Sequence, residues 1–289
     1  MKPHFKTFPL IILALLFFIA CKKSDDGGQL FVRSFDDGSW TEQTDFPGAG
    51  RTAASSFSIE DKGYIICGWI DGTGSKLGKE FWEYDKATDT WTQKDDFPGA
   101  GRNAATGFAI GNKGYLVCGW SEDHSSVLGK QFWEWDQTTD KWTQKTDFPG
   151  EARTSASGFA IGTKGYMLCG WIENGNSQLG KEIWEWDQTT DKWTQKSDFP
   201  GEPRNAASGF AIGSKGYLVC GNIEGNGSQL GNEIWEWDQT RDKWTQMTDF
   251  SGAARNGASS FTIGSNSYLI GGWVDGNGSR LGKEFWKYQ

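Results

Sequence analysis

Histidine is nearly absent from this chain of 289 residues, which contains only His4 and His124. A Ser-His-Asp triad and a multi-histidine metal site both need histidine beside other polar groups. His4 lies in a basic and apolar N-terminal stretch that is typical of a processing signal, so His124 alone is expected in the processed protein. We therefore assign no catalytic residue, no metal ligand and no cofactor, and we expect His124 to be a solvated loop residue.

Long hydrophobic runs are also missing. The apolar stretch from Phe8 to Ala20 has about a dozen residues, fewer than the roughly 20 that span a bilayer, so a transmembrane anchor is the weaker interpretation. Long aliphatic runs are few elsewhere, whereas the chain contains 40 glycines and 17 tryptophans. This composition favours β structure with many turns over a helical protein.

The residues FIAC at 18–21 resemble a bacterial lipobox, in which the cysteine is lipidated and becomes the first residue of the mature protein. The resemblance implies a signal peptide at residues 1–20, lipidation of Cys21 and a flexible tether at residues 21–35; plain secretory cleavage is the alternative. No aspartate directly follows Cys21, so we expect an outer membrane lipoprotein of the bacterial cell envelope. The tether KKSDDGG also resembles signals that send lipoproteins to the cell surface in some Gram-negative bacteria.

The chain has fewer basic than acidic residues. Removal of residues 1–20 takes away Lys2 and Lys6 and leaves 27 basic against 37 acidic residues, a net charge of −10. Nucleic-acid binding needs a surface that neutralises phosphates, so this charge disfavours a nucleic-acid partner. We expect contact with a membrane only through the lipid anchor.

A sequence repeat organises the rest of the chain. The motif DFPG begins at positions 45, 96, 147 and 198, DFSG begins at 249, and every interval is 51 residues. Within one period, turn residues separate four strand-like runs: residues 103–110, 113–120, 130–136 and 141–148. Four strands in a period of about 50 residues indicate a β-propeller blade.

All 17 tryptophans belong to this repeat. Large flat side chains fill the wedge-shaped gaps between twisted sheets, where each buries about 150–250 Å². Most of them are therefore expected to pack the fold rather than to bind a ligand.

The order of an arginine before the first strand, KGY in the second, and an aromatic-Asp pair with tryptophan seven residues later resembles the kelch repeat. The resemblance covers residues 36–289 in five copies. It implies an all-β fold, a kelch-type propeller with four-stranded antiparallel blades. The usual Gly-Gly pair is Cys-Gly in four copies and becomes Gly271-Gly272 in the fifth.

The two ends of the repeat region complement each other. The chain offers residues 39–46 as a fourth strand alone and ends after a third strand at residues 283–289. We predict that the N-terminal strand pairs with the C-terminal blade and closes a five-bladed ring, so that no sheet edge stays open. An open arc or an oligomer is the alternative.

Four cysteines lie one period apart on the second strands: Cys67, Cys118, Cys169 and Cys220. Equivalent atoms in different blades are expected to exceed the roughly 7 Å that a disulfide can bridge. The fifth copy has Gly271 at this position, so the site requires a small residue, and we predict buried, unpaired thiols. The loops DGTGS (71–75) and DGNGS (275–279) faintly resemble calcium loops, but we expect them to be turns.

One set of residues is a candidate ligand site. The resemblance implies that the arginine before each first strand lies at the mouth of the central channel, near the loop after the second strand. Guanidinium groups bind carboxylates and indoles stack on sugars or side chains. The candidates are Arg51, Arg102, Arg153, Arg204 and Arg255 with Trp69, Trp120, Trp171 and Trp273. A structural role is the alternative for both sets.

Three functions are compatible with these features. The first is a lipid-anchored binding module that presents the arginine and tryptophan face to an acidic peptide, an anionic glycan or a partner protein. The second is a structural scaffold of the envelope. The third and least supported is a sugar-modifying enzyme that resembles the kelch-type sialic-acid mutarotase, because no single repeat stands out as catalytic. Whether the protein is an enzyme stays open.

Overall fold

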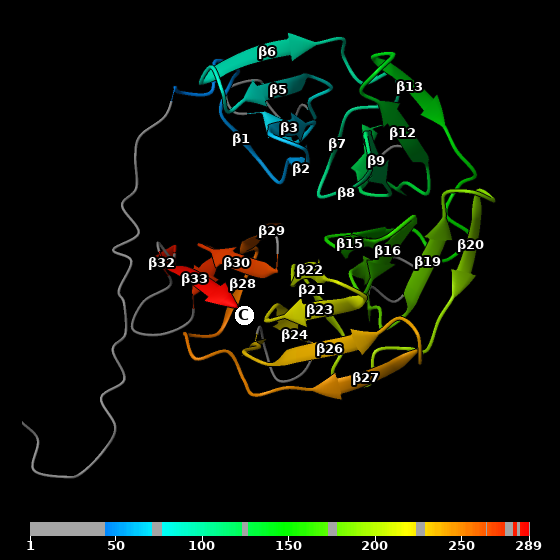
Figure 1. Cartoon of the computed structure of the whole chain (residues 1–289), viewed down its shortest axis with the longest axis vertical. Helices are drawn as coiled ribbons and strands as arrows, with labels where there is room; N and C mark the ends of the chain where they lie inside the picture. The colour runs from blue at the N-terminus through cyan, green and yellow to red at the C-terminus, as the bar shows by residue number, and fades with distance from the viewer. Residues whose placement is uncertain are drawn as a thin grey trace, which may run out of the picture. The chain divides into compact units, whose positions relative to one another are not determined.

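A computed structural model of the chain describes residues 44–70, 77–122, 127–172, 178–223, 229–263, 265–274, 280–281 and 284–288. Over these ranges the regular structure consists of β-strands joined by turns and loops. No helix capable of crossing a membrane is found in this described part. Residues 43–289 form one compact unit, in which the sheets lie around a common centre (Figure 1).

The strands follow the 51-residue period. The first repeat contains β1 (Arg51–Thr52), β2 (Ser55–Ile59), β3 (Lys62–Ile66), β4 (Trp69–Ile70), β5 (Phe81–Asp85) and β6 (Thr90–Lys94). The second contains β7 (Arg102–Asn103), β8 (Thr106–Ile110), β9 (Lys113–Val117), β10 (Trp120–Ser121), β11 (Val127–Leu128), β12 (Phe132–Asp136) and β13 (Lys141–Gln144). The third contains β14 (Arg153–Thr154), β15 (Ser157–Ile161), β16 (Lys164–Leu168), β17 (Trp171–Ile172), β18 (Gln178–Leu179), β19 (Ile183–Asp187) and β20 (Lys192–Gln195).

The last two repeats continue this order. The fourth contains β21 (Arg204–Asn205), β22 (Ser208–Ile212), β23 (Lys215–Val219), β24 (Asn222–Ile223), β25 (Gln229–Leu230), β26 (Ile234–Asp238) and β27 (Lys243–Gln246). The fifth contains β28 (Arg255–Asn256), β29 (Ser259–Ile263), β30 (Asn266–Ile270), β31 (Trp273–Val274), β32 (Arg280–Leu281) and β33 (Phe285–Tyr288).

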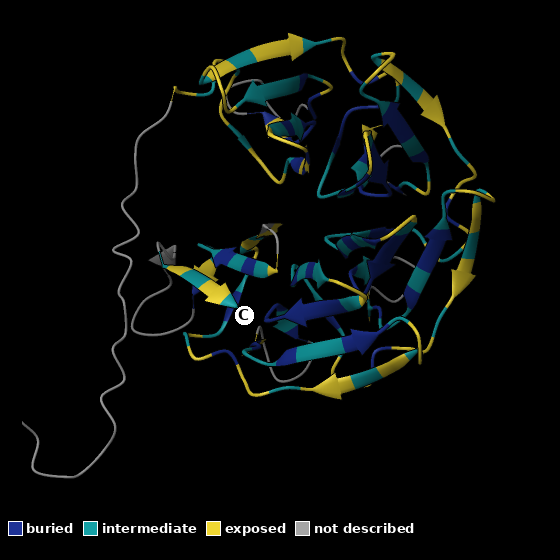
Figure 2. Ribbon diagram, viewed as in Figure 1, coloured by how far each residue is buried: buried dark blue, intermediate teal, exposed yellow. Residues whose placement is uncertain are grey.

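The longer strands form the predicted antiparallel blades. They pair in the orders β2-β3-β5-β6, β8-β9-β12-β13, β15-β16-β19-β20, β22-β23-β26-β27 and β29-β30-β33. The last sheet thus has three strands among the described residues, with β33 outermost. Figure 2 shows the outer strands β6, β13, β20 and β27 mainly exposed, whereas the strands inside them are mostly buried or half-buried.

Each of the two inner strands is divided in two, which the sequence did not predict. In the second repeat, Ala104 has a φ of 46° between β7 and β8, and Cys118 and Gly119 have φ values of 61° and 90° between β9 and β10. Left-handed residues turn the chain and end a regular ladder. The short strands therefore pair separately, in the orders β1-β4, β7-β10-β11, β14-β17-β18, β21-β24-β25 and β28-β31-β32.

Aromatic side chains fill the wedge between neighbouring sheets. At the first junction, Phe57 and Phe81 form one buried cluster with Leu116 and Trp135 of the second repeat. The ring of Trp135 lies 4.9 Å from that of Phe81 in an edge-on arrangement, which aromatic pairs prefer. Equivalent clusters join the second repeat to the third, the third to the fourth and the fourth to the fifth. Each of the first four repeats thus completes its core with residues of the next one.

Hydrogen bonds near the centre also cross each of these junctions. At the first junction, the amide of Gly68 donates to the carbonyl of Arg102 at 2.8 Å, and the amide of Ala104 donates to Ala53 at 2.7 Å. The hydroxyl of Ser55 donates to the carbonyl of Ala105 at 2.8 Å. The same three bonds recur at the next three junctions. Because two of these three bonds join backbone atoms on both sides, they fix how closely the inner strands approach.

The last and first repeats are not joined in this way among the described residues. No hydrogen bond links Gly272 to Arg51, and the side chain of Phe261, equivalent to buried Phe57, is 41% exposed. The predicted N-terminal strand falls mainly on residues 39–43, which lie outside the described residues. Closure into a five-bladed ring therefore stays a prediction.

Gly63 and Gly114 test the packing between repeats, because they occupy one position in successive repeats. A Cβ atom on Gly114 would lie 2.1 Å from Cζ of Phe57 in the preceding repeat, whereas one on Gly63 would meet no atom within 4 Å. We expect Gly114→Ala to lower the free energy of unfolding by about 1–3 kcal/mol through overpacking. Gly63→Ala should be neutral or stabilise by up to about 1 kcal/mol. Urea titration of both variants measures the difference, and an equal loss in both would mean that another group covers Gly63.

Candidate functional site

The five candidate arginines start the innermost short strands β1, β7, β14, β21 and β28. The side chain of Arg51 is 5% exposed, and the other four arginines are 0–1% exposed. Each guanidinium lies over the phenylalanine of the preceding DFPG or DFSG motif, with Cζ 4.8–5.0 Å from the ring centre. This geometry is a cation–π contact inside the fold.

Most of their donors are also used within the fold, whereas Nη2 of Arg153 and Nη2 of Arg204 have no hydrogen-bond partner among the described residues. In the third repeat, Nη1 of Arg153 donates to the carbonyl of Cys169 at 2.9 Å and pairs with Glu182 at 3.2 Å, and Nε donates to the carbonyl of Glu151 at 3.1 Å. The other four arginines likewise donate Nη1 to the residue sixteen positions later. One arginine thus ties the DFPG turn to the second strand and to the start of the third. This arrangement favours the structural role over a ring of accessible guanidinium groups.

The tryptophans on the short strands β4, β10, β17 and β31 are more exposed than the arginines. Trp69 on β4 is 43% exposed and Trp273 on β31 is 46% exposed, whereas Trp120 on β10 and Trp171 on β17 are half-buried. The next residue points inward in each case, since Ile70, Ser121, Ile172 and Val274 are all buried. Alternation along these strands therefore turns the indoles toward the surface. Asn222 on β24 is the exception of the set.

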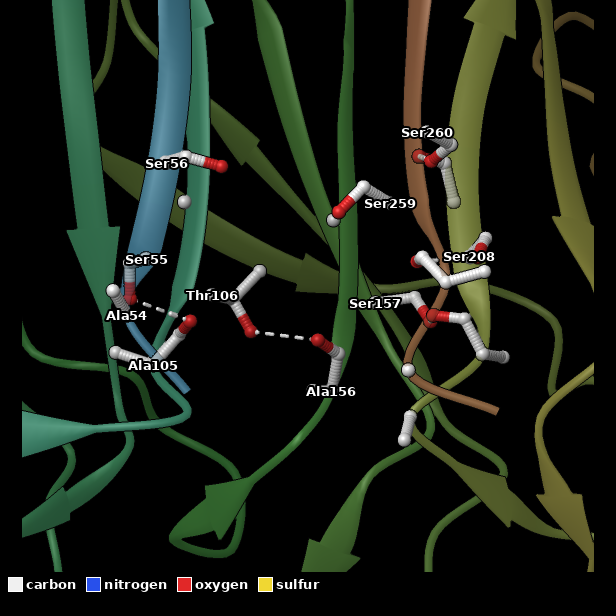
Figure 3. Close-up of a pocket in the computed structure, with 17 residues that line it drawn as sticks. Ala54, Ser55, Ser56, Ala105, Thr106, Ala156, Ser157, Ser208, Ser259 and Ser260 are labelled. Carbon is white, nitrogen blue, oxygen red and sulfur yellow. Dashed lines mark hydrogen bonds between the residues drawn. The ribbon is translucent and has the colours of Figure 1, made fainter. Parts of the chain in front are cut away.

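A cavity of about 280 Å³ lies at the centre of the sheets. It is lined by small residues in or directly before β2, β8, β15, β22 and β29, including Ala54, Thr106, Gly158, Ser208 and Ser259 (Figure 3). The first long strand of each repeat, β2, β8, β15, β22 or β29, therefore borders this cavity. The tryptophan strands adjoin this cavity, because Trp69 pairs with Thr52, two residues before Ala54.

The hydroxyl groups of this cavity were not predicted from the sequence. Ser55 and Thr106 donate across the junctions to Ala105 and Ala156, as Figure 3 shows, and Ser157 and Ser208 do the same at the following junctions. The signal that could have revealed them is a serine or threonine at the same position of every repeat: Ser55, Thr106, Ser157, Ser208 and Ser259. Since the first four of these hydroxyls already donate to carbonyls, they hold the sheets together.

The four repeated cysteines are free and buried, as predicted. Each has a left-handed backbone with φ between 59° and 63°, and Gly271 has 68° at the same place in the fifth repeat. Glycine adopts this conformation without steric cost, which explains why the fifth copy can use it. Burial raises the pKa of Cys118 and Cys169 to about 12.

Several sequence predictions concern residues outside the described ranges. These are His124, the loops at 71–75 and 275–279, and Cys21 with the signal and tether. Within the described ranges no group of three or more histidine, cysteine, aspartate or glutamate residues could hold a metal ion.

Comparison with known proteins places this fold. No protein-family model matches the chain. Kelch-like protein terF from Aspergillus terreus is 25% identical over 201 residues, which are 67% of this chain and 43% of that protein. The chain therefore spans less than half the length of this curated relative. A solved structure titled "Structure of YjhT" superposes with a TM-score of 0.74 at 16% identity, covering 86% of this chain and 84% of the other. Together with the sheet topology, these similarities identify the fold as a kelch-type β-propeller.

The structural role of the arginines predicts a stability effect. Arg153→Ala would leave the carbonyl of Cys169 and the carboxylate of Glu182 without their donor and would open a buried space. We expect the free energy of unfolding to fall by about 3 kcal/mol or more. Arg241→Ala is the control, because that side chain is 76% exposed and should change stability by less than about 0.5 kcal/mol. Equal stability of the two variants in urea would contradict the structural role.

The raised thiol pKa values predict slow alkylation. Near pH 8.5 an ordinary thiol is about half thiolate, whereas one with a pKa of about 12 is thiolate in less than about 0.1% of molecules. Folding shifts the equilibrium between thiolate and thiol toward the neutral thiol. Alkylation of these cysteines should therefore appear only as the pH approaches 12 or when the protein unfolds. Mass spectrometry after iodoacetamide treatment should show Cys67, Cys118, Cys169 and Cys220 unmodified at pH 8.5 and modified in urea. Modification of folded protein at these sites would show that the repeats open readily.

Proposed function

We propose that the protein is an interaction module whose contact surface is the tryptophan face, defined here as Trp69, Trp120, Trp171 and Trp273. The kelch-type propeller fold suggests a protein-interaction module. The observation that carries the choice of surface is the exposure of Trp69 and Trp273, in a fold that buries Trp135, Trp186 and Trp237 completely. A partly exposed indole offers a large rigid contact area with little entropy to lose on binding.

The residues that follow the tryptophans in the sequence favour a basic partner protein. The arginines that would have attracted carboxylates are buried and paired, so an acidic peptide or an anionic glycan loses its main attraction. By contrast, an acidic residue follows two positions after each member of the tryptophan set and after Asn222: Asp71, Glu122, Glu173, Glu224 and Asp275. Lysine and arginine side chains stack on indoles and are attracted by carboxylates. The partner we infer presents such side chains to the tryptophan face.

The proposal includes the predicted lipid anchor. FIAC at 18–21, with the basic and apolar stretch before it, supports lipidation of Cys21 and a place in the bacterial cell envelope at the outer membrane. A globular domain held by acyl chains and a polar tether would then present the tryptophan face to other envelope proteins. Mass spectrometry of the mature N-terminus after expression in a bacterial host tests this part, since an unmodified Cys21 would contradict it.

Peptide binding tests the tryptophan face. Decapeptides rich in arginine and tyrosine should bind more tightly than matched peptides in which glutamate replaces arginine. The double variant Trp69→Ala, Trp273→Ala should weaken binding at least about tenfold, because exposed aromatic anchors dominate such contacts. Its melting temperature should change little, since both indoles are partly in water.

A gain-of-binding variant serves as the matched control. Asn222→Trp completes the set at the one repeat that lacks the indole and should strengthen binding of the basic peptide. Binding that is unchanged in both the double variant and Asn222→Trp would place the contact surface elsewhere.

A further inference from the structure

A repeated contact at the outer rim joins the end of a fourth strand to the repeat that follows it. After β13, the amide and the hydroxyl of Thr146 donate to the carboxylate of Asp191 at 3.3 and 3.1 Å. The carbonyl of Thr146 accepts a hydrogen bond from the indole of Trp193 at 3.2 Å. Thr44 and Ser197 make the same three contacts with the repeats that follow them. We call this set of three bonds the rim clip.

Among the described residues the rim clip is missing at the junction of the first and second repeats. Asp95 stands there in the position of Thr146, and neither its amide nor its side chain donates to Asp140, the aspartate of the second repeat. An ionised aspartate has only acceptor atoms and is repelled by a second carboxylate. The buried indole N–H of Trp142 has no acceptor within the described ranges. Lys94 pairs with Asp140 at 2.9 Å instead, but that carboxylate is 42% exposed, so the ion pair holds the repeats only weakly.

The inner edge of the same junction is fully bonded. The amide of Gly68 donates to the carbonyl of Arg102 at 2.8 Å, and the amide of Ala104 donates to that of Ala53 at 2.7 Å. Both equivalent bonds at the second junction measure 2.9 Å. Two sheets that are bonded along one edge and lack the clip along the opposite edge can rotate about the bonded edge, as in a hinge.

We propose that the first junction is a hinge, at which the first repeat swings outward about the inner hydrogen bonds without unfolding the other repeats. Opening separates Trp142 from Phe81 and Phe97, whose ring centres lie 5.4 and 5.2 Å from it in the closed state. Trp69 lies on the first repeat and Trp120 on the second, so the same motion changes the spacing of the tryptophan face. This consequence for binding rests on the proposed function, whereas the hinge itself does not.

The native cysteines report the opening of each junction. Cys67, Cys118 and Cys169 belong to the buried clusters of the first, second and third junctions. All three are 0–1% exposed, and burial raises the pKa of each thiol to about 12, so different alkylation rates reflect different access. In urea below the unfolding transition, iodoacetamide should modify Cys67 at least about tenfold faster than the other two, as peptide mapping by mass spectrometry would show. Equal rates at the three thiols would overturn the hinge.

Matched substitutions separate the missing clip from the position of the first repeat in the chain. Asp95→Thr supplies the hydroxyl donor and should slow alkylation of Cys67 to the rate of Cys118. Thr146→Asp removes a rim clip and should speed alkylation of Cys118 at least about tenfold. Both positions are exposed, so the variants should keep the fold, which circular dichroism checks. An unchanged rate in either variant would contradict the proposal, whatever the outcome of peptide binding to the tryptophan face.

Discussion

The contact between one repeat and the next is the interaction on which the whole structure depends. A single sheet leaves the ring of Phe57 and its neighbours open on one face, and residues of the following repeat, chiefly Leu116 and Trp135, cover them. Backbone hydrogen bonds between the inner strands then fix the spacing of the sheets. A repeat has no complete core of its own, so stability grows junction by junction. The small residues around the central cavity follow from the same close approach.

The buried arginines belong to this constraint as well. Arg153 joins a turn, a second strand and a third strand that would otherwise leave carbonyl groups without donors. A side chain with five donors in a rigid fork suits this task better than a lysine does. Repetition of this arginine in every copy therefore fits a structural need of the fold, and the contact surface that we propose is the tryptophan face instead.

The period and the strand pattern made the sheets predictable from the sequence. The strand predicted at residues 103–110 contains β8 (Thr106–Ile110) but also the end of β7 and the break between them, and the 51-residue spacing transferred this assignment to the other copies. The break at Cys118 could not be read in the same way, because a non-glycine residue seldom adopts a left-handed φ. Gly271 at the equivalent position was the available signal. The burial of Arg153 could not be predicted from the sequence either. A charged residue before a strand is usually exposed, and only the hydrogen-bond partners of Arg153 explain its buried position.

The close similarity of the junctions has a consequence for folding kinetics. The face of Phe57 that receives Leu116 and Trp135 is chemically almost equal to the face of Phe159 that receives Leu218 and Trp237. Side-chain recognition alone cannot distinguish the adjacent repeat from one further along the chain. Correct order must then come from the short connections between repeats, which favour the nearest neighbour, and docking that skips a repeat becomes a trap that the chain has to leave before it reaches the native state.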